Sequence, residues 1–254
     1  MPKRKAPEAT NVLVVGAGGW GQAKIKDAPG YKKGATKKLK KGIWALSGTA
    51  KEFKAGAFAS LPFSISWLEY NESNGLLYAA GDDEKLHSLR LMMQNGKLTA
   101  KVISSSNTMG GSAHFTIHPE GAWAITANYG SGLLCVLPLA ADGAIGDASD
   151  SKQPWPLDGL DPDLADRQEA CHPHQVLLDP TLSKWALACD LGADCVWVYQ
   201  FNKANGGLLG AVNSSRHLQL PRGSGPRHLA FHPNKKWVYI LCELSGKVRT
   251  ARQQ

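Results

Sequence analysis

Apolar and polar residues alternate in short runs along most of the chain. The runs are about four to eight residues long, rich in Val, Ile, Leu, Tyr and Trp, and separated by turns of Gly, Pro, Asn and Asp. A period of two is typical of half-buried β-strands, and no segment shows a convincing helical period of 3.6 residues. The pattern therefore predicts an all-β protein.

The alternating pattern also repeats. Three segments, which begin at His114, His174 and His228, each run from a histidine through an apolar stretch and a proline-containing turn to a second apolar stretch. A fainter copy begins at Phe63, with serine in place of the histidine. The three histidines are 60 and 54 residues apart, a spacing that suits a four-stranded blade with a loop insertion. We therefore predict a β-propeller of four-stranded blades.

The second apolar stretch of each repeat has a tryptophan near its start and a polar residue at its end. We expect the tryptophans in the core; they are Trp123, Trp185 and Trp237. The polar residues follow five or six positions later, and we interpret them as one recurring position of the blade; they are Asn128, Asp190 and Glu243.

The composition, 43% hydrophobic and 20% charged, is that of an ordinary globular protein. No stretch approaches the roughly 18 apolar residues of a membrane span, and the apolar run near the N-terminus is too short for a convincing signal peptide. We therefore expect a cytoplasmic protein without a membrane partner. The five cysteines form no CxxC pair, so we expect buried free thiols; they are Cys135, Cys171, Cys189, Cys195 and Cys242.

The net charge of +8 is concentrated in two lysine-rich patches, the opening PKRK and residues 32–41. We interpret both as solvated segments, so nucleic acid is not expected as a partner. The predicted organisation is a basic tail at 1–10 and a single propeller domain at 11–254, with a Lys-rich loop at 32–41.

A glycine-rich segment near the N-terminus mimics a dinucleotide-binding motif. Gly16, Gly18 and Gly21 fit G-x-G-x-x-G after an apolar strand. A nucleotide site needs a helix to begin there, but Pro29, Gly30 and Gly34 break the following sequence. We therefore favour a first propeller strand and its loop, with no cofactor.

Five motifs in the repeats carry a more specific signal: ANYGSG at 127–132, HPHQ at 172–175, DLGAD at 190–194, GSGPRHLAFHP at 223–233 and CEL at 242–244. In this order and spacing they resemble the blade motifs of the 6-phosphogluconolactonase family, a seven-bladed propeller related to carboxymuconate-cyclising enzymes. The resemblance implies a lactone hydrolase that acts on a small anionic sugar lactone without a cofactor.

The resemblance also implies site residues. Arg227 and Glu243 match positions proposed as catalytic in the wider propeller family, and His174 matches its histidine, suited to move a proton or bind phosphate. These types suit ester hydrolysis, which needs activated water, a donor to the oxyanion and groups that hold the anionic tail.

Four further residues are candidates for substrate binding: His172, His228, Asn128 and Asp190. Structural roles are the alternative, because a histidine that repeats from blade to blade often serves packing, and Asn or Asp at a turn often caps backbone amides. Cys171 and its neighbouring histidines are suitable zinc ligands, but their spacing is irregular, so we expect no metal.

Chain length bears on closure of the ring. Seven blades of about 50 residues need roughly 350 residues, whereas the chain has 254. We therefore expect about five blades, an incomplete ring, and edge strands open to association with another chain. Three functions follow: hydrolysis of 6-phosphogluconolactone in the oxidative pentose phosphate pathway, muconate-type lactone cyclisation on the same fold, or an inactive propeller fragment that acts as a scaffold.

Overall fold

The computed structural model describes residues 11–17, 41–49, 52–153, 165–209 and 217–252. The predicted basic tail at 1–10 lies outside these residues, as does the Lys-rich loop at 32–41 apart from Lys41. Gly16 lies in the first strand, whereas Gly18 and Gly21 are also outside the described residues.

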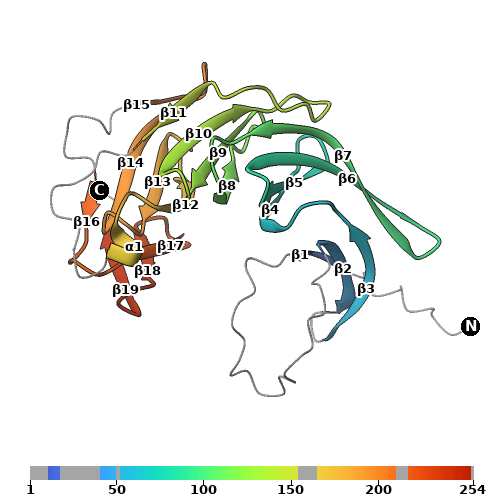
Figure 1. Cartoon of the computed structure of the whole chain (residues 1–254), viewed down its shortest axis with the longest axis horizontal. Helices are drawn as coiled ribbons and strands as arrows, with labels where there is room; N and C mark the ends of the chain where they lie inside the picture. The colour runs from blue at the N-terminus through green and yellow to red at the C-terminus, as the bar shows by residue number, and fades with distance from the viewer. Residues whose placement is uncertain (1–10, 18–40, 50–51, 154–164, 210–216, 253–254) are drawn as a thin grey trace, which may run out of the picture.

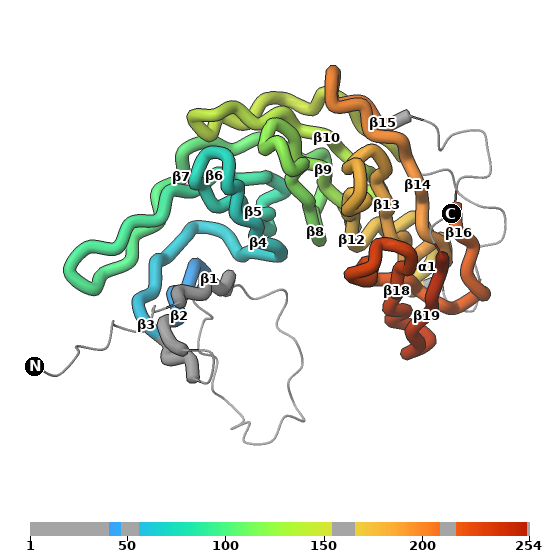
Figure 2. The backbone as a smooth tube through the Cα atoms, turned by 180° about the vertical axis from the view of Figure 1, so that it is seen from behind, coloured from blue at the N-terminus to red at the C-terminus, as the bar shows by residue number. Residues whose placement is uncertain are grey.

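The described strands form five antiparallel sheets that follow one another along an arc (Figures 1 and 2). This confirms the all-β, propeller-like fold. The sheets contain, in chain order, β1 (Asn11–Ala17), β2 (Gly42–Thr49) and β3 (Glu52–Ser60); β4 (Ile65–Asn71), β5 (Leu76–Gly81), β6 (Lys85–Gln94) and β7 (Lys97–Asn107); β8 (Ser112–Ile117), β9 (Trp123–Asn128), β10 (Leu133–Pro138) and β11 (Asp150–Lys152); β12 (Pro173–Leu178), β13 (Trp185–Asp190), β14 (Cys195–Asn202), β15 (Gly207–Leu209) and β16 (His217–Gln219); and β17 (Pro226–Phe231), β18 (Trp237–Cys242) and β19 (Lys247–Arg252).

The first strand of each sheet lies on the concave side of the arc, and β7, β11 and β15 lie on the convex side (Figure 1). The described part of the chain has one helix, the four-residue α1 (Ala165–Gln168), which precedes β12. No described helix is long and apolar enough to cross a membrane.

The apolar core is divided into four layers, each between two neighbouring sheets. One layer packs Ile125 and Leu134 of the third sheet against Val176 and Trp197 of the fourth. Because each pair of neighbouring sheets shares one apolar layer, the positions of the first strands relative to one another are fixed by apolar packing.

The expectation that all three repeat tryptophans lie in the core is wrong for Trp237. Trp123 and Trp185 are half-buried, but Trp237 is 41% exposed. Burial alternates along β18, so Val238 and Ile240 pack toward the fourth sheet while Trp237 lies on the opposite face. The expectation for the cysteines is confirmed, since all five are buried and free.

The first strands β4, β8, β12 and β17 each contain a β-bulge at the same place. One residue has no partner in the ladder, directly after the first pair of the strand. These bulged residues are Ser66, Ala113, His174 and Arg227. A bulge redirects a side chain that regular alternation would aim elsewhere, so the fold offers one redirected side chain in each of these four sheets.

The turn between the second and third strand also recurs in the last four sheets. It has four residues in the last three sheets, at 129–132, 191–194 and 243–246, and three residues, 82–84, in the second sheet. Its last residue always has a left-handed backbone; these residues are Glu84 (φ 61°), Gly132 (φ 73°), Asp194 (φ 51°) and Gly246 (φ 63°). Asp tolerates this conformation better than most residues other than glycine.

Candidate active site

The residues of β4, β8, β12 and β17 near the bulges converge on the concave side. The rings of Trp67 and His114 lie 4.1 Å apart, those of Trp67 and His228 6.5 Å, and those of His174 and His228 5.2 Å. These side chains come from first strands of four different sheets, so the arc brings together residues separated by up to 161 positions in sequence.

The structure corrects the alignment of the repeat histidines. His114 and His228 follow the bulge in their strands, but the residue that follows the bulge in β12 is Gln175. His174 itself is the bulged residue, and its counterpart in β17 is Arg227. Aligning the repeats on their histidines misses this shift, because all four strands carry the bulge and β12 has its histidine at the bulge instead of one residue after it.

His174 is held as a neutral imidazole. Burial, together with the positive charge of Arg227 and the neighbouring His228, lowers the pKa of His174 to about 4. Its Nδ1 atom is buried and has no hydrogen-bond partner in another described residue. The side chain as a whole is only half-buried, and a neutral imidazole is suited to accept or donate a proton.

Glu243 lies between two arginines. Arg227 donates to its Oε2 atom, and Arg167 of α1 donates to its Oε1 atom over 2.7 Å. Burial disfavours the carboxylate, but the hydrogen bonds from both guanidinium groups outweigh it and hold the pKa of Glu243 below its ordinary value. Glu243 is therefore ionised near neutral pH, and its carboxylate fixes the orientation of both arginines.

Glu243 also does not occupy the position predicted for it. Asn128 and Asp190 pair with the first residue of the preceding strand, and the residue that does so in the last sheet is Cys242. Glu243 is the next residue, equivalent to Tyr129 in the third sheet.

Tyr129 belongs to the same cluster. Its hydroxyl is hydrogen-bonded to Arg167, and its ring stacks on that of His172 at 4.4 Å. His172 is buried, with Nδ1 2.9 Å from the Tyr129 carbonyl and Nε2 2.9 Å from Glu169 Oε1. The predicted binding residue His172 is therefore engaged by the protein and supports the cluster from behind. His228, in contrast, is only partly buried.

Asp194 holds the two segments that carry Arg167 and Arg227. Its Oδ1 atom accepts hydrogen bonds from Gln168 Nε2 (2.9 Å) and from the Gly225 amide (2.7 Å), and its Oδ2 atom accepts one from the Gly223 amide (2.7 Å). Gln168 follows Arg167 directly, and Gly225 stands two residues before Arg227. One buried carboxylate thus positions both arginine-bearing segments.

Two predicted substrate-binding residues have structural roles instead. Asn128 is fully buried, accepts a hydrogen bond from Ser112 Oγ (2.5 Å) and donates one to the Thr108 carbonyl (2.5 Å). Asp190 is also fully buried, and its carboxylate accepts bonds from the His172 amide (2.7 Å) and Trp197 Nε1 (2.9 Å). Nothing in this geometry supports contact with substrate, because neither side chain is accessible.

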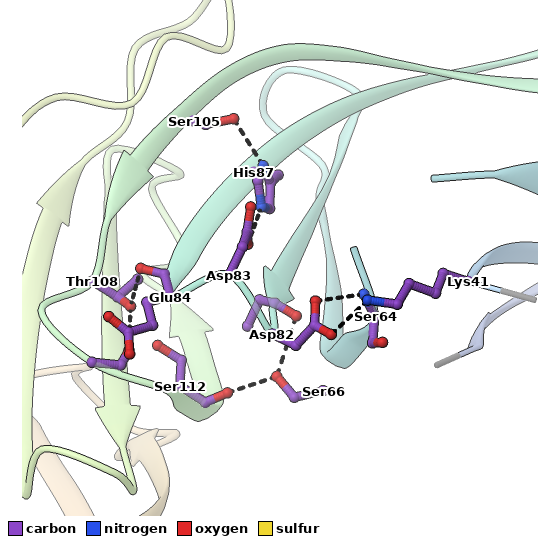
Figure 3. A network of polar contacts seen from close by, with 12 residues as sticks. Lys41, Ser64, Ser66, Asp82, Asp83, Glu84, His87, Ser105, Thr108 and Ser112 are labelled. Carbon is purple, nitrogen blue, oxygen red and sulfur yellow. Dashed lines mark hydrogen bonds and ion pairs between the residues drawn. The ribbon is translucent and has the colours of Figure 1, made fainter. Parts of the chain in front are cut away.

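The same end of the second sheet has a different network (Figure 3). Ser66, at the bulge, donates to the Ser112 carbonyl over 2.6 Å. Asp82, in the turn, accepts from the Ser64 amide and from Lys41 Nζ, both over 2.8 Å. These contacts satisfy the backbone and tie the sheets together. Among the described residues, no group of His, Cys, Asp and Glu is arranged to hold a metal ion.

Sequence reasoning brought together His174, Arg227, Glu243, His172 and His228, which do form one cluster. It missed Arg167, Gln168 and Tyr129. Tyr129 lies within the ANYGSG motif and was overlooked in favour of Asn128. Arg167 lies in a segment between repeats that carries no periodic signal, so only the fold reveals its position.

Comparison with known proteins agrees with this architecture. Residues 34–254 match the family described as "Lactonase, 7-bladed beta-propeller". The chain belongs to this lactonase family. Its sheets are therefore blades of a lactonase-type propeller.

Individual relatives carry related names. The chain is 30% identical over 207 residues to a probable 6-phosphogluconolactonase of Arthroderma benhamiae, covering 80% of this chain and 49% of that protein. It is 29% identical over 232 residues to the 6-phosphogluconolactonase of Bacillus subtilis, covering 86% and 60%. A Bacteroides fragilis protein provisionally assigned as a 6-phosphogluconolactonase has a similar structure, with a TM-score of 0.75, 25% identity and coverage of 99% and 66%. The chain thus spans about half to two thirds of the length of these relatives.

Proposed function

We propose that this protein hydrolyses 6-phosphogluconolactone to 6-phosphogluconate. The observation that carries the proposal is the cluster of neutral His174, cationic Arg227 and ionised Glu243 at the bulged ends of β12 and β17. The lactonase family and the names of the relatives support the same reaction class.

In the proposed reaction, His174 accepts a proton from water while the water oxygen forms a bond to the lactone carbonyl carbon. Arg227, beside His174, stabilises the negative charge that develops on the carbonyl oxygen. The bond between this carbon and the ring oxygen then breaks, and the proton on His174 passes to the ring oxygen. The product acid loses its own proton to solvent.

Glu243 acts here as a positioning residue. With its pKa lowered by two arginines, its carboxylate is a weak base, but it holds Arg227 toward the reacting group. The negative charge that develops on the lactone carbonyl oxygen stabilises the imidazolium of His174 and so offsets its low pKa as the proton is taken up.

We extend the proposal to a cytoplasmic location. Five free, buried cysteines are typical of proteins that live in a reducing compartment. Cell fractionation with an antibody to the protein tests this location, and recovery in a secreted or membrane fraction would contradict it.

The test is hydrolysis of 6-phosphogluconolactone above the spontaneous rate, compared among wild type, Arg227→Ala and His174→Gln. Loss of an oxyanion donor is expected to lower kcat by about 100- to 1000-fold for Arg227→Ala. Ser66→Ala, at the equivalent bulge of β4, is the matched control and is expected to retain the wild-type rate. A wild type no faster than the spontaneous reaction would favour an inactive scaffold, and activity on muconate-type lactones alone would favour the other reaction.

A further inference from the structure

Arg167 has no role in the proposed reaction, yet it contacts the same carboxylate as Arg227. It comes from α1, and its guanidinium donates to Oε1 of Glu243, whereas Arg227 donates to Oε2. The side chains of Arg167 and Arg227 are 43% and 39% exposed, so both are accessible to a ligand.

The two arginines differ in their surroundings. The charge of Arg227 acts on both His174 and His228 and lowers their pKa values. Arg167 instead binds Glu243 and interacts with Tyr129 and the nearby Glu169. Glu243 therefore separates an arginine beside the proton-transfer group from an arginine further out.

Arg167 is positioned by a built framework. The next residue, Gln168, is 1% exposed and donates to the Leu191 carbonyl over 2.7 Å and to Asp194 over 2.9 Å. The Tyr129 hydroxyl contacts the guanidinium from the third sheet. Three sheets thus hold Arg167 in place, although its head group remains accessible.

An arginine held in this way retains free capacity for a ligand. A guanidinium group has five N–H donors in a planar fork that matches phosphate, and Glu243 and Tyr129 engage only part of that fork. Glu169, the other nearby carboxylate, is 2.9 Å from His172 Nε2 and 53% exposed. Its charge reduces the positive potential around Arg167, but its side chain is directed to His172 and leaves the guanidinium accessible.

We propose that Arg167 is a specificity-determining residue that binds the phosphate of the substrate, while Arg227 binds the lactone carbonyl. The inference rests on the proposed function and deepens it. One arginine recognises the phosphate, the other takes part in the chemistry, and both bind the carboxylate of Glu243. It explains how an enzyme of this kind distinguishes a phosphorylated lactone from a neutral one.

The experiment compares 6-phosphogluconolactone with unphosphorylated gluconolactone as substrates. Arg167→Ala is expected to raise KM for the phosphorylated lactone about 10- to 100-fold, the loss of a charge-assisted hydrogen bond, and to leave kinetics with the neutral lactone unchanged. Arg227→Ala is expected to lower kcat for both substrates. Arg90→Ala, which removes an exposed arginine of β6, controls for net charge and is expected to behave as wild type.

Equilibrium binding separates this inference from the proposed function. Wild type is expected to bind 6-phosphogluconate more tightly than gluconate by calorimetry, and Arg167→Ala to lose this preference, even if no lactone is hydrolysed. Far-ultraviolet circular dichroism and the unfolding midpoint show whether each variant is folded. A folded Arg167→Ala that keeps the wild-type preference for the phosphorylated ligand would overturn the inference.

Discussion

The first strands β4 and β8 have the same bulge as β12 and β17, but different side chains occupy it. Ser66 and Ala113 stand at the first two bulges, and His174 and Arg227 at the other two. The turns differ in the same way: Asp82 binds a backbone amide and Lys41 in the second sheet, whereas Glu243 binds two arginines in the last. The backbone is common to both regions, so the chemistry is set by side-chain identity at a few repeated positions.

The most severe test of this comparison is a pair of substitutions at the last residue of the turn, one in the fourth sheet and one in the second. Asp194→Gly keeps the left-handed backbone, as Gly132 and Gly246 do in equivalent turns, but removes three hydrogen bonds that hold Gln168, Gly223 and Gly225. We expect a loss of about 2–4 kcal/mol in the free energy of unfolding, because buried donors lose their partner, together with loss of hydrolysis. Urea titration measures the stability.

Glu84→Gly is the matched control in the second sheet. Glu84 has the same left-handed backbone at φ 61° but an exposed side chain. Glycine relieves the strain, so stability is expected to stay constant or rise by about 1 kcal/mol. Equal losses in both variants would mean that the turn backbone, and not the Asp194 carboxylate, organises the site.

The next expected effect is a slope of stability with pH, of about 1.4 kcal/mol per pH unit for each proton bound. Burial lowers the pKa of His114 to about 3 and that of His174 to about 4, from an ordinary 6.5. Between about pH 6.5 and these values the unfolded chain binds more protons than the folded protein, so the free energy of unfolding falls as pH falls from 7 to 4. Above pH 7 this contribution is constant.

His114→Gln tests the cause of that slope. His114 is 1% exposed, and its replacement is expected to flatten the decline by about 1.4 kcal/mol per pH unit, the value for one proton. His232→Gln, in the turn after β17 and outside this cluster, is expected to retain the wild-type slope. An unchanged slope in His114→Gln would show that His114 is not buried as described. Denaturant titrations at several pH values provide the measurement.

The smallest effect is expected at Lys41. Its ammonium group lies 2.8 Å from Asp82, with the two side chains 42% and 30% exposed. Lys41→Ala is expected to change stability by no more than about 1 kcal/mol, since solvent and salt screen such pairs, and to leave hydrolysis unchanged. A clear loss of lactone hydrolysis, with stability retained, would show that the second sheet also contributes to the chemistry.

The sequence predicted the fold well because the signals involved are periodic. Alternating strands, turns and repeated motifs revealed the all-β blades, and the motif residues His174, Arg227 and Glu243 do lie together. What failed was register. His174 lies at the bulge, one position before the places of His114 and His228, and Glu243 stands one position beyond those of Asn128 and Asp190.

The remaining errors have a common physical origin. Asn128 and Asp190 are polar residues at strand ends, which a sequence cannot distinguish from ligand contacts, but burial commits their side chains to backbone and tryptophan donors. Arg167 was invisible because its position depends on long-range contacts of Gln168 with a turn 23 to 26 residues later. Such contacts leave no local pattern in the chain.

The recurring bulge has a consequence for how new activities arise on this scaffold. A bulged residue makes no ladder pair, so exchanging it disturbs the sheet less than exchanging its paired neighbours. Selection at Ser66 and Ala113 is therefore comparatively free to follow chemistry. A combinatorial library limited to these two positions would introduce acids, bases or cations on the concave side, one blade at a time. The strands that carry them could meanwhile evolve separately for stability.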